Sequence, residues 1–219
     1  MKTIQFAGKS LMLDPSGVLL WPERQIAVVA DLHLEKATYF AQRGQLLPPQ
    51  ESCDTLLNLQ SALDRVECSS LILLGDSFHD ETGFQRLERD SRALWEQICE
   101  QYAVTFIVGN HDGAFVPPNT ESADYLEVGG LVFRHQAEPG SVAEISGHYH
   151  PKASLKFRGN RITRPCFVTD GQRMILPAFG TLTGGLDVRS REISELFSPD
   201  CVVHFLGENK IYSVPVSKL

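Results

Sequence analysis

Long hydrophobic runs are missing from this sequence, whose longest apolar stretches are short segments such as IAVVA and LILL. A membrane-spanning helix needs about 20 consecutive apolar residues, so we expect no membrane association. The N-terminal segment MKTIQFAGKSLML has no long apolar region and no cleavage site of small residues. We therefore expect no signal peptide.

Cysteine is scarce as well. The five cysteines are odd in number, widely spaced and without a CxxC pair, which argues against a disulfide framework or a thiolate metal site. We expect a cytoplasmic protein whose reduced thiols are small core residues. The 219 residues, 42% of them hydrophobic and 21% charged, are typical of a globular protein. Because we find no repeat or linker-like segment, we predict a single domain over residues 1–219.

The net charge of −7 argues mildly against general coating of nucleic acid. Between residues 151 and 173, however, six basic residues stand against one acidic residue, Asp170. A basic segment is more often a solvated surface than a binding site, but this one begins two residues after the candidate metal ligand His150. Its basic residues are Lys152, Lys156, Arg158, Arg161, Arg164 and Arg173.

Short runs rich in Val, Ile and Leu predict strands that are buried on both faces. They are QIAVVAD, SLILLGD, VTFIVGN, GLVFRH and VAEISGH. The spacing of apolar residues predicts helices over 49–66 and 83–102. This alternation of strands and helices in the first half favours a mainly parallel sheet with helical cover.

The second half has a different pattern. ITRPCFVTDGQRMIL predicts a type I′ hairpin around Asp170 and Gly171. CVVHFLGENKIYSVPV predicts another hairpin, and SREISELF a short helix, so we expect mostly antiparallel strands here. The fold class that accommodates both halves is α/β, in the form of an α+β sandwich: two layers of mixed β-sheet flanked by helices.

Polar residues follow the five predicted strands, at the ends where ligands gather in open α/β sheets. The segments are ADLH, LLGDSFHD, VGNHD, FRH and SGHYH, and they contain six of the seven histidines. Histidines scattered through a core would not concentrate in this way. Gly75, Gly109 and Gly147 precede these residues and would let the backbone approach bound ions closely.

The chemistry of these side chains indicates a metal centre. Aspartate, histidine and asparagine without cysteine suit a divalent ion such as Mn²⁺, Fe²⁺ or Zn²⁺. Seven ligands are too many for one tetrahedral site, but they suit two ions about 3.5–4 Å apart that share a carboxylate. Asp76 is the natural bridge because it can give one oxygen to each ion.

The series D-x-H, G-D, G-N-H-D, H and G-H-x-H resembles the calcineurin-like binuclear metallophosphoesterases. The resemblance implies the metallophosphoesterase fold and one histidine of the G-H-x-H motif for each ion. It assigns Asp31, His33 and His150 to the first metal, Asn110, His135 and His148 to the second, and Asp76 to both.

Longer segments of the sequence resemble one family within this superfamily. VVADLHLEKATYFAQRGQLLP, LLGDSFHD, GHYHPKA, RPCF and LPAFGTLTGGL are similar to bacterial ligase-associated DNA-damage-response phosphoesterases, from about residue 11 to the C-terminus. Glu35 stands where that family often has glycine. The resemblance implies a Mn²⁺-dependent phosphodiesterase and DNA endonuclease in DNA repair. Its expected substrate is single-stranded DNA, and its expected functional associates are a DNA ligase, a helicase and an exonuclease.

Two such ions would activate a water as hydroxide for in-line attack on phosphorus. We assign His111, which follows the ligand Asn110, to phosphate stabilisation or to protonation of the leaving oxygen, with Asp112 as a possible orienting partner. His79 either faces the substrate phosphate or packs at the edge of the site.

The metal ligands alone do not determine whether the protein hydrolyses phosphodiesters or phosphomonoesters. A phosphomonoesterase or nucleotide phosphatase is therefore the alternative function. A non-catalytic scaffold is a weaker alternative, because all seven ligands and His111 are present. The basic segment favours a polyanion over a small phosphate. Its candidate substrate-binding residues are Arg158, Arg161 and Arg164.

Overall fold

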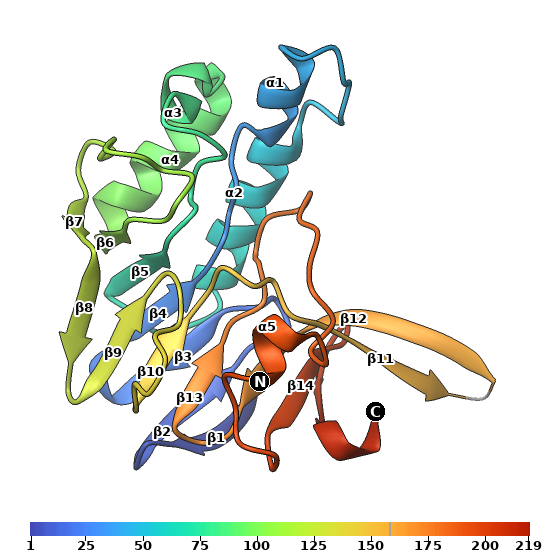
Figure 1. Ribbon diagram of the computed structural model, residues 1–219. Helices are drawn as coiled ribbons and strands as arrows, with labels where there is room; N and C mark the ends of the chain where they lie inside the picture. Colours follow the sequence, from blue (N-terminus) through green and yellow to red (C-terminus); the bar gives the residue numbers. More distant parts are fainter. Residues whose placement is uncertain (158) are drawn as a thin grey trace.

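The computed structural model describes residues 1–157 and 159–219, and two β-sheets packed against each other form its centre (Figure 1). The predicted two-layer mixed sandwich is therefore confirmed. The first sheet contains, in spatial order, β1 (Lys2–Phe6), β2 (Lys9–Leu13), β3 (Leu19–Trp21), β4 (Ile26–Val29), β5 (Ser70–Leu74), β6 (Ala103–Ile107) and β7 (Glu121–Ala123). The second contains β15 (Ile211–Pro215), β14 (Val202–Leu206), β12 (Asn160–Thr169), β13 (Arg173–Ile175), β10 (Glu144–Ser146), β9 (Leu131–Arg134) and β8 (Tyr125–Val128), with β11 (Lys152–Phe157) paired to β12.

In the first sheet the strand pairing changes from antiparallel to parallel at β4. Strands β4 to β7 are mutually parallel, as the strand–helix alternation predicts. Strands β1, β2 and β3 add an antiparallel extension that the sequence analysis did not predict. Because β4, β5 and β6 are parallel neighbours, their carboxyl ends lie at the same edge of the sheet.

The second sheet is less antiparallel than expected, because β10 runs parallel to both β9 and β13. The hairpin near Asp170 exists, but Thr169 pairs with Met174 across a loop of four residues. A type I′ turn needs two central residues with positive φ, and here Gly171 alone has one, at 88°. The predicted turn type is therefore wrong; Asp170 Oδ1 instead accepts hydrogen bonds from the amides of Gln172 and Arg173.

Helices cover the outer face of the first sheet (Figure 1). The helix predicted over 83–102 is interrupted, because Leu87 and Glu88 are extended, with ψ of 123° and 160°. This break lets Phe84 pack against Phe78 and Trp95, with ring centroids 5.8 and 6.4 Å away. The helices are α1 (Lys36–Ala41), α2 (Glu51–Leu63), α3 (Gly83–Arg86), α4 (Arg89–Gln101) and α5 (Arg191–Ser194), with 3₁₀ turns η1 (Pro22–Arg24) and η2 (Val216–Lys218).

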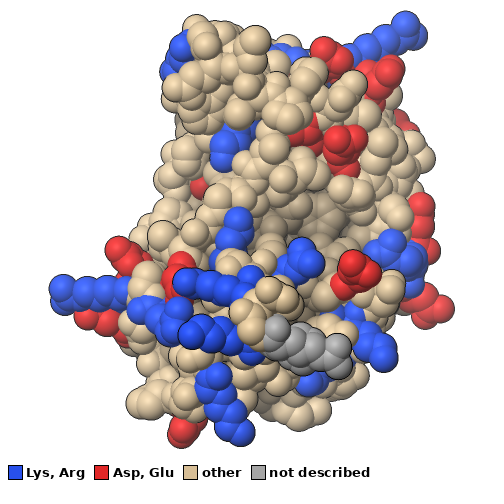
Figure 2. Space-filling view, turned by 90° about the vertical axis from the view of Figure 1, so that its right-hand side faces the viewer, with Lys and Arg blue, Asp and Glu red and all other residues tan. Residues whose placement is uncertain are grey.

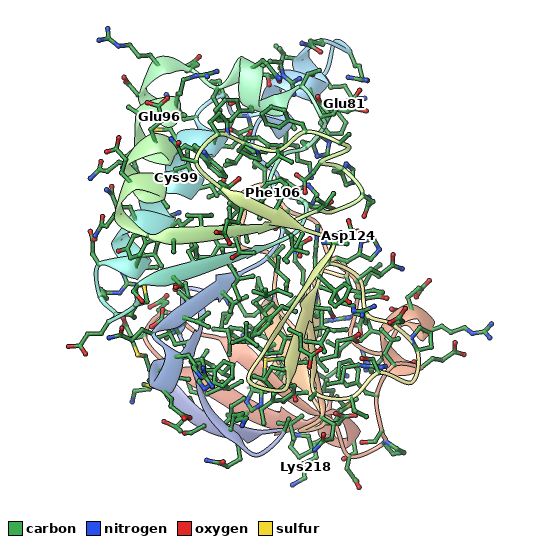
Figure 3. The ribbon with its side chains drawn as sticks, turned by 90° about the vertical axis from the view of Figure 1, so that its left-hand side faces the viewer. Glu81, Glu96, Cys99, Phe106, Asp124 and Lys218 are labelled. Carbon is green, nitrogen blue, oxygen red and sulfur yellow. The ribbon has the colours of Figure 1, made fainter. Side chains whose placement is uncertain are left out.

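One apolar layer lies on each side of the first sheet. Ala27 and Val29 of β4 pack toward the helices, and Val28 packs between the sheets, so the strand is apolar throughout. The chain crosses from the first sheet to the second at Asp124, between β7 and β8 (Figure 3). The inter-sheet core unites residues from both halves of the chain, whereas the single-domain assignment stays a prediction. No helix in the described ranges combines the length and apolar character that crossing a membrane requires.

Candidate metal centre

The seven predicted ligands lie where strands of the two sheets end. Asp31 and His33 follow β4, Asp76 follows β5, and Asn110 follows β6. In the second sheet His135 follows β9, and His148 and His150 follow β10. Parallel pairing within each sheet gathers these ends at one edge, so residues far apart in the sequence form one cluster.

The backbone of the cluster is strained. Five of the seven predicted ligands have left-handed φ values, a conformation that costs non-glycine residues on the order of 1–3 kcal/mol each. Leu32 and Tyr149, which stand between the paired ligands, are buried. The chain can thus anchor an apolar side chain in the core and present the residue on each side of it to the cluster. The five φ values are 56° (Asp31), 47° (His33), 49° (Asp76), 71° (His148) and 46° (His150).

One group of donors comprises Asp31, His33 and His150. The Nε2 atoms of His33 and His150 are 3.2 Å apart, and Asp31 Oδ1 is 3.4 Å from His150 Nε2. Two imidazole nitrogens and a carboxylate oxygen that converge in this way suit a divalent cation.

A second group comprises Asp76, His135 and His148. His135 Nε2 lies 3.3 Å from Asp76 Oδ2, 3.1 Å from His148 Nδ1 and 3.0 Å from Asn110 Oδ1. His135 Nδ1 donates to the carbonyl of Leu74 at 3.1 Å. Because a carbonyl only accepts, this bond leaves the Nε2 lone pair available to an ion.

Asp76 lies between the two groups. Its Oδ2 atom, close to His135 in the second group, is 3.9 Å from His33 Nε2 in the first. Its Oδ1 atom accepts the amide of His111 at 2.9 Å, which fixes the carboxylate. The donors therefore fit two divalent ions that share Asp76, and the division between the two ions stays a prediction.

The pKa values of three predicted ligands, His33, His148 and Asp76, favour cation binding. Burial, with a further contribution from His150, lowers the pKa of His33 to about 2. Burial and the neighbouring His135 lower the pKa of His148 as well. Burial alone would raise the pKa of Asp76, but hydrogen bonding to His135 and the charges around it lower that pKa to about 2. At neutral pH the His33 and His148 imidazoles are neutral and the Asp76 carboxylate is ionised, as metal ligands must be. Burial lowers the pKa of His135, but hydrogen bonding to Asp76 and the charges of Asp31 and Asp76 outweigh burial and raise that pKa, so an ion would have to displace the His135 proton.

All three predicted glycines touch the cluster directly. A Cβ atom at Gly75 would collide with the His135 ring, one at Gly109 with the backbone and carboxylate of Asp76, and one at Gly147 with the carboxylate of Asp31. Any side chain at these positions would displace a predicted ligand. The expected close approach of the backbone is therefore present.

His111 lies beside the cluster without belonging to either ligand group. Its Nδ1 atom is 3.0 Å from the carbonyl oxygen of His79, and its Nε2 atom is 4.0 Å from Asp76 Oδ2. The carbonyl accepts, so Nδ1 carries a proton and Nε2 is free to act. Because the His111 side chain is 39% exposed, a substrate can reach it.

Asp112 has a different environment from the one expected. Its Oδ1 atom accepts the amide of Phe78, and its Oδ2 atom accepts the amide of Gly109, both at 2.9 Å. Both oxygens thus tie together the loops that carry Asp76 and Asn110. Burial raises the pKa of Asp112 to about 6. These contacts favour a structural role over the predicted orientation of His111, whose ring is held by the His79 carbonyl.

His79 is largely buried, at 9% exposure, and stacks on His111 with ring centroids 5.1 Å apart. Its Nδ1 atom is 3.4 Å from the Nδ1 atom of His33. The rings of His33, His79 and His111 could by themselves hold an ion, but the Nε2 atom of His33 already faces His150. The contacts therefore favour the second of the two predicted roles, packing and hydrogen bonding at the edge of the site.

We expect His79→Ala to lower metal affinity and turnover about 10–100-fold, the usual effect of losing a residue that orients a metal ligand. His79→Asn should lose less, because its amide can still accept a hydrogen bond from His33. Metal titration and DNA cleavage measure both effects. A raised KM with unchanged metal affinity would indicate instead that His79 contacts substrate.

The predicted substrate-binding arginines do not share one surface. Arg161 and Arg164 are both exposed on β12, but three residues apart on a strand they point to opposite faces. Arg158 lies outside the described residues. Arg173 is buried, 3.3 Å from Glu144, and donates to the carbonyls of Glu138, Ser141 and Leu196, so it is not part of a basic surface.

Glu35 replaces glycine without disturbing the centre. It has a φ of 63°, in the left-handed region that favours glycine. Its amide donates to Ser52 Oγ at 2.7 Å, and its carboxylate accepts from Thr38 Oγ1 at 2.7 Å. These bonds hold the residue at the start of α1.

Known proteins resemble the chain as follows. The family model of calcineurin-like phosphoesterases matches residues 24–211. Among solved structures, a nuclease, MPE, of Pseudomonas putida is 29% identical over 97% of this chain and 99% of its own, with a TM-score of 0.77. A conserved uncharacterised protein of Streptococcus pneumoniae, described as a predicted phosphoesterase, is 16% identical over 86% of this chain and 94% of its own, with a TM-score of only 0.33. No curated protein sequence gives a significant match.

Proposed function

The chain belongs to the calcineurin-like phosphoesterases and is a metal-dependent phosphoesterase, and we propose that it hydrolyses phosphodiester bonds in DNA, chiefly in single strands. The observation that carries this proposal is the pair of donor groups that share Asp76 beside the exposed ring of His111. Similarity to a nuclease over nearly the whole chain supports a nucleic-acid substrate.

The chain's own residues would bind the ions, orient the substrate and move a proton. When bound, two divalent ions supply a hydroxide nucleophile at neutral pH and positive charge for the phosphoryl oxygens. Asp76 would be a ligand in both groups. His111, whose ring is fixed through Nδ1, would present Nε2 either to a phosphoryl oxygen or to the leaving oxygen; both roles need a second proton on Nε2, which the leaving oxygen takes in the second case.

We propose Mn²⁺ as the ion, which the resemblance to the ligase-associated phosphoesterases supports. Fe²⁺ and Zn²⁺ are the alternatives, because oxygen and imidazole donors without thiolate suit all three ions. We place the activity in cytoplasmic DNA repair, in functional association with a DNA ligase, a helicase and an exonuclease. The resemblance of its motifs to the ligase-associated phosphoesterases supports this role.

We expect the Mn²⁺-loaded protein to cleave a closed circular single strand faster than the matching duplex, because the backbone of an unpaired strand can bend into the cluster. Parallel reactions with Zn²⁺ or Mg²⁺, and with p-nitrophenyl phosphate as a monoester, complete the test. A protein that hydrolyses the monoester but leaves both DNA substrates intact would be a phosphomonoesterase, the alternative function.

A further inference from the structure

The hairpin of β11 and β12 extends beyond the body of the second sheet as an arm (Figure 1). We define the arm as residues 152–157 and 160–165, which pair across six positions. A two-stranded ribbon has little core of its own. The arm is stabilised at its base by Ala153 and Leu155, which pack in the same apolar cluster as Cys166, and by cross-strand contacts, among them a 2.7 Å hydrogen bond between Ser154 and Thr163.

The two faces of the arm differ in charge. On β12, Phe167 packs between the two sheets, whereas Cys166 packs in a separate cluster on the outer side. Following the alternation back along the strand, Arg161 lies on the inner face with Phe167, and Arg164 lies on the outer face with Cys166. The β11 residues that pair with the inner face are Lys152, opposite Pro165, and Lys156, directly opposite Arg161.

Lys156 and Arg161 form an unusual pair. Both are exposed, and like charges directly opposite each other on a sheet destabilise it. The nearby carboxylate of Asp187 is already paired with Arg189, at 3.1 Å. Lys and Arg side chains gather around the arm in the view toward its tip (Figure 2). The repulsion would be relieved by a polyanion on this face.

The inner face begins at the metal centre. Lys152 follows the ligand His150 by two residues, and its Nζ atom donates to the carbonyl of Thr183 at 3.2 Å. Its side chain lies over Gly185, where a Cβ atom would collide with the His150 carbonyl. Lys152 therefore places positive charge between the cluster and the arm.

We propose that Lys152, Lys156 and Arg161, the basic face of the arm, hold the backbone phosphates of a single DNA strand where it leaves the metal centre on the His150 side. Lys156 is about 13 Å beyond Lys152, at about 3.3 Å per residue. That length is about four stacked nucleotides at ~3.4 Å each. The inference rests on the proposed nuclease function.

Arg161→Ser and Arg164→Ser are the matched pair for a test, because both remove one exposed arginine from the same strand but from opposite faces. Steady-state cleavage of a fluorescent single-stranded oligonucleotide is measured over a salt series, with direct binding of the same oligonucleotide. Bis-p-nitrophenyl phosphate serves as the small diester. Arg161→Ser should raise the KM for DNA several-fold and reduce the log–log salt slope by about 0.7, the value for one phosphate contact on a single strand.

The double variant Lys156→Ser/Arg161→Ser should roughly double the change in the salt slope. Arg164→Ser should have the wild-type KM for DNA and the wild-type salt slope. All variants should hydrolyse the small diester at the wild-type rate. The arm proposal is overturned if wild type cleaves DNA and the Arg161 and Arg164 variants behave alike. A wild-type protein that hydrolyses the diester but neither binds nor cleaves DNA would overturn the nuclease function itself, and the arm proposal with it.

Discussion

Replacing Asp76 with alanine should remove bound metal more completely than any other single substitution and reduce phosphodiester cleavage by at least about 10³-fold. The reason is its position: one oxygen faces both donor groups, 3.3 Å from His135 Nε2 and 3.9 Å from His33 Nε2. Without the carboxylate, two cations would repel each other with no shared negative charge between them. Metal analysis after reconstitution should give two ions per chain for wild type and at most one for the variant.

Control variants show whether metal binding depends on the charge or on the size of the Asp76 side chain. Asp76→Asn keeps the size of the side chain and one oxygen, and should lose metal nearly as fully because the charge is gone. Glu81→Ala removes an exposed carboxylate from the same loop (Figure 3) and should keep both ions. Wild-type metal content and affinity in Asp76→Ala would show that Asp76 is not the bridge, and saturation of wild type at one ion would exclude the binuclear centre.

The second large effect is expected at His111. His111→Ala should keep both metals, because the contact of residue 111 with Asp76 is made by its main-chain amide and survives the substitution. Turnover on DNA should fall by about 10²–10⁴, the range for losing a general acid or a charge-stabilising group. Metal analysis and kcat measured on the same preparation test both parts.

Leaving groups of different basicity distinguish the two roles of His111. If its Nε2 atom protonates the leaving oxygen, the loss should shrink on p-nitrophenyl esters, whose leaving group needs little protonation. An equal loss on DNA and on these esters would assign His111 to stabilisation of the phosphoryl charge. A loss of metal would place His111 among the ligands, contrary to its position outside both groups.

The sequence predicted the central sheet well because its strands are buried on both faces. The run from Ile26 to Val29 contacts the helices on one side and the second sheet on the other, so it must be apolar throughout. The sequence predicted the helix over 83–102 less well, since periodicity does not show the break at Leu87 and Glu88, which separates α3 from α4 and lets Phe84 of α3 pack with Phe78 and Trp95. Strands β1 and β2 were missed although they alternate as strands do: Phe6, Leu11 and Leu13 are buried, and Gln5 and Ser10 are exposed. This signal was present in the sequence, whereas the three residues of β3 are too few to show a period.

The chemistry of the centre could be predicted from the amino-acid sequence, because the residue types, their order and their positions after strands are local properties of the chain. Tertiary structure decided which side chains meet. Parallel pairing of β10 with β9 brings His135 and His148 within 3.1 Å, and no local pattern encodes a partner strand. The same holds for Asp112, whose hydrogen bonds join two loops, and for Arg161 and Arg164, whose faces depend on the register of β12. Local composition fixes which atoms can bind an ion or a phosphate, whereas strand pairing and register fix which of those atoms share one surface.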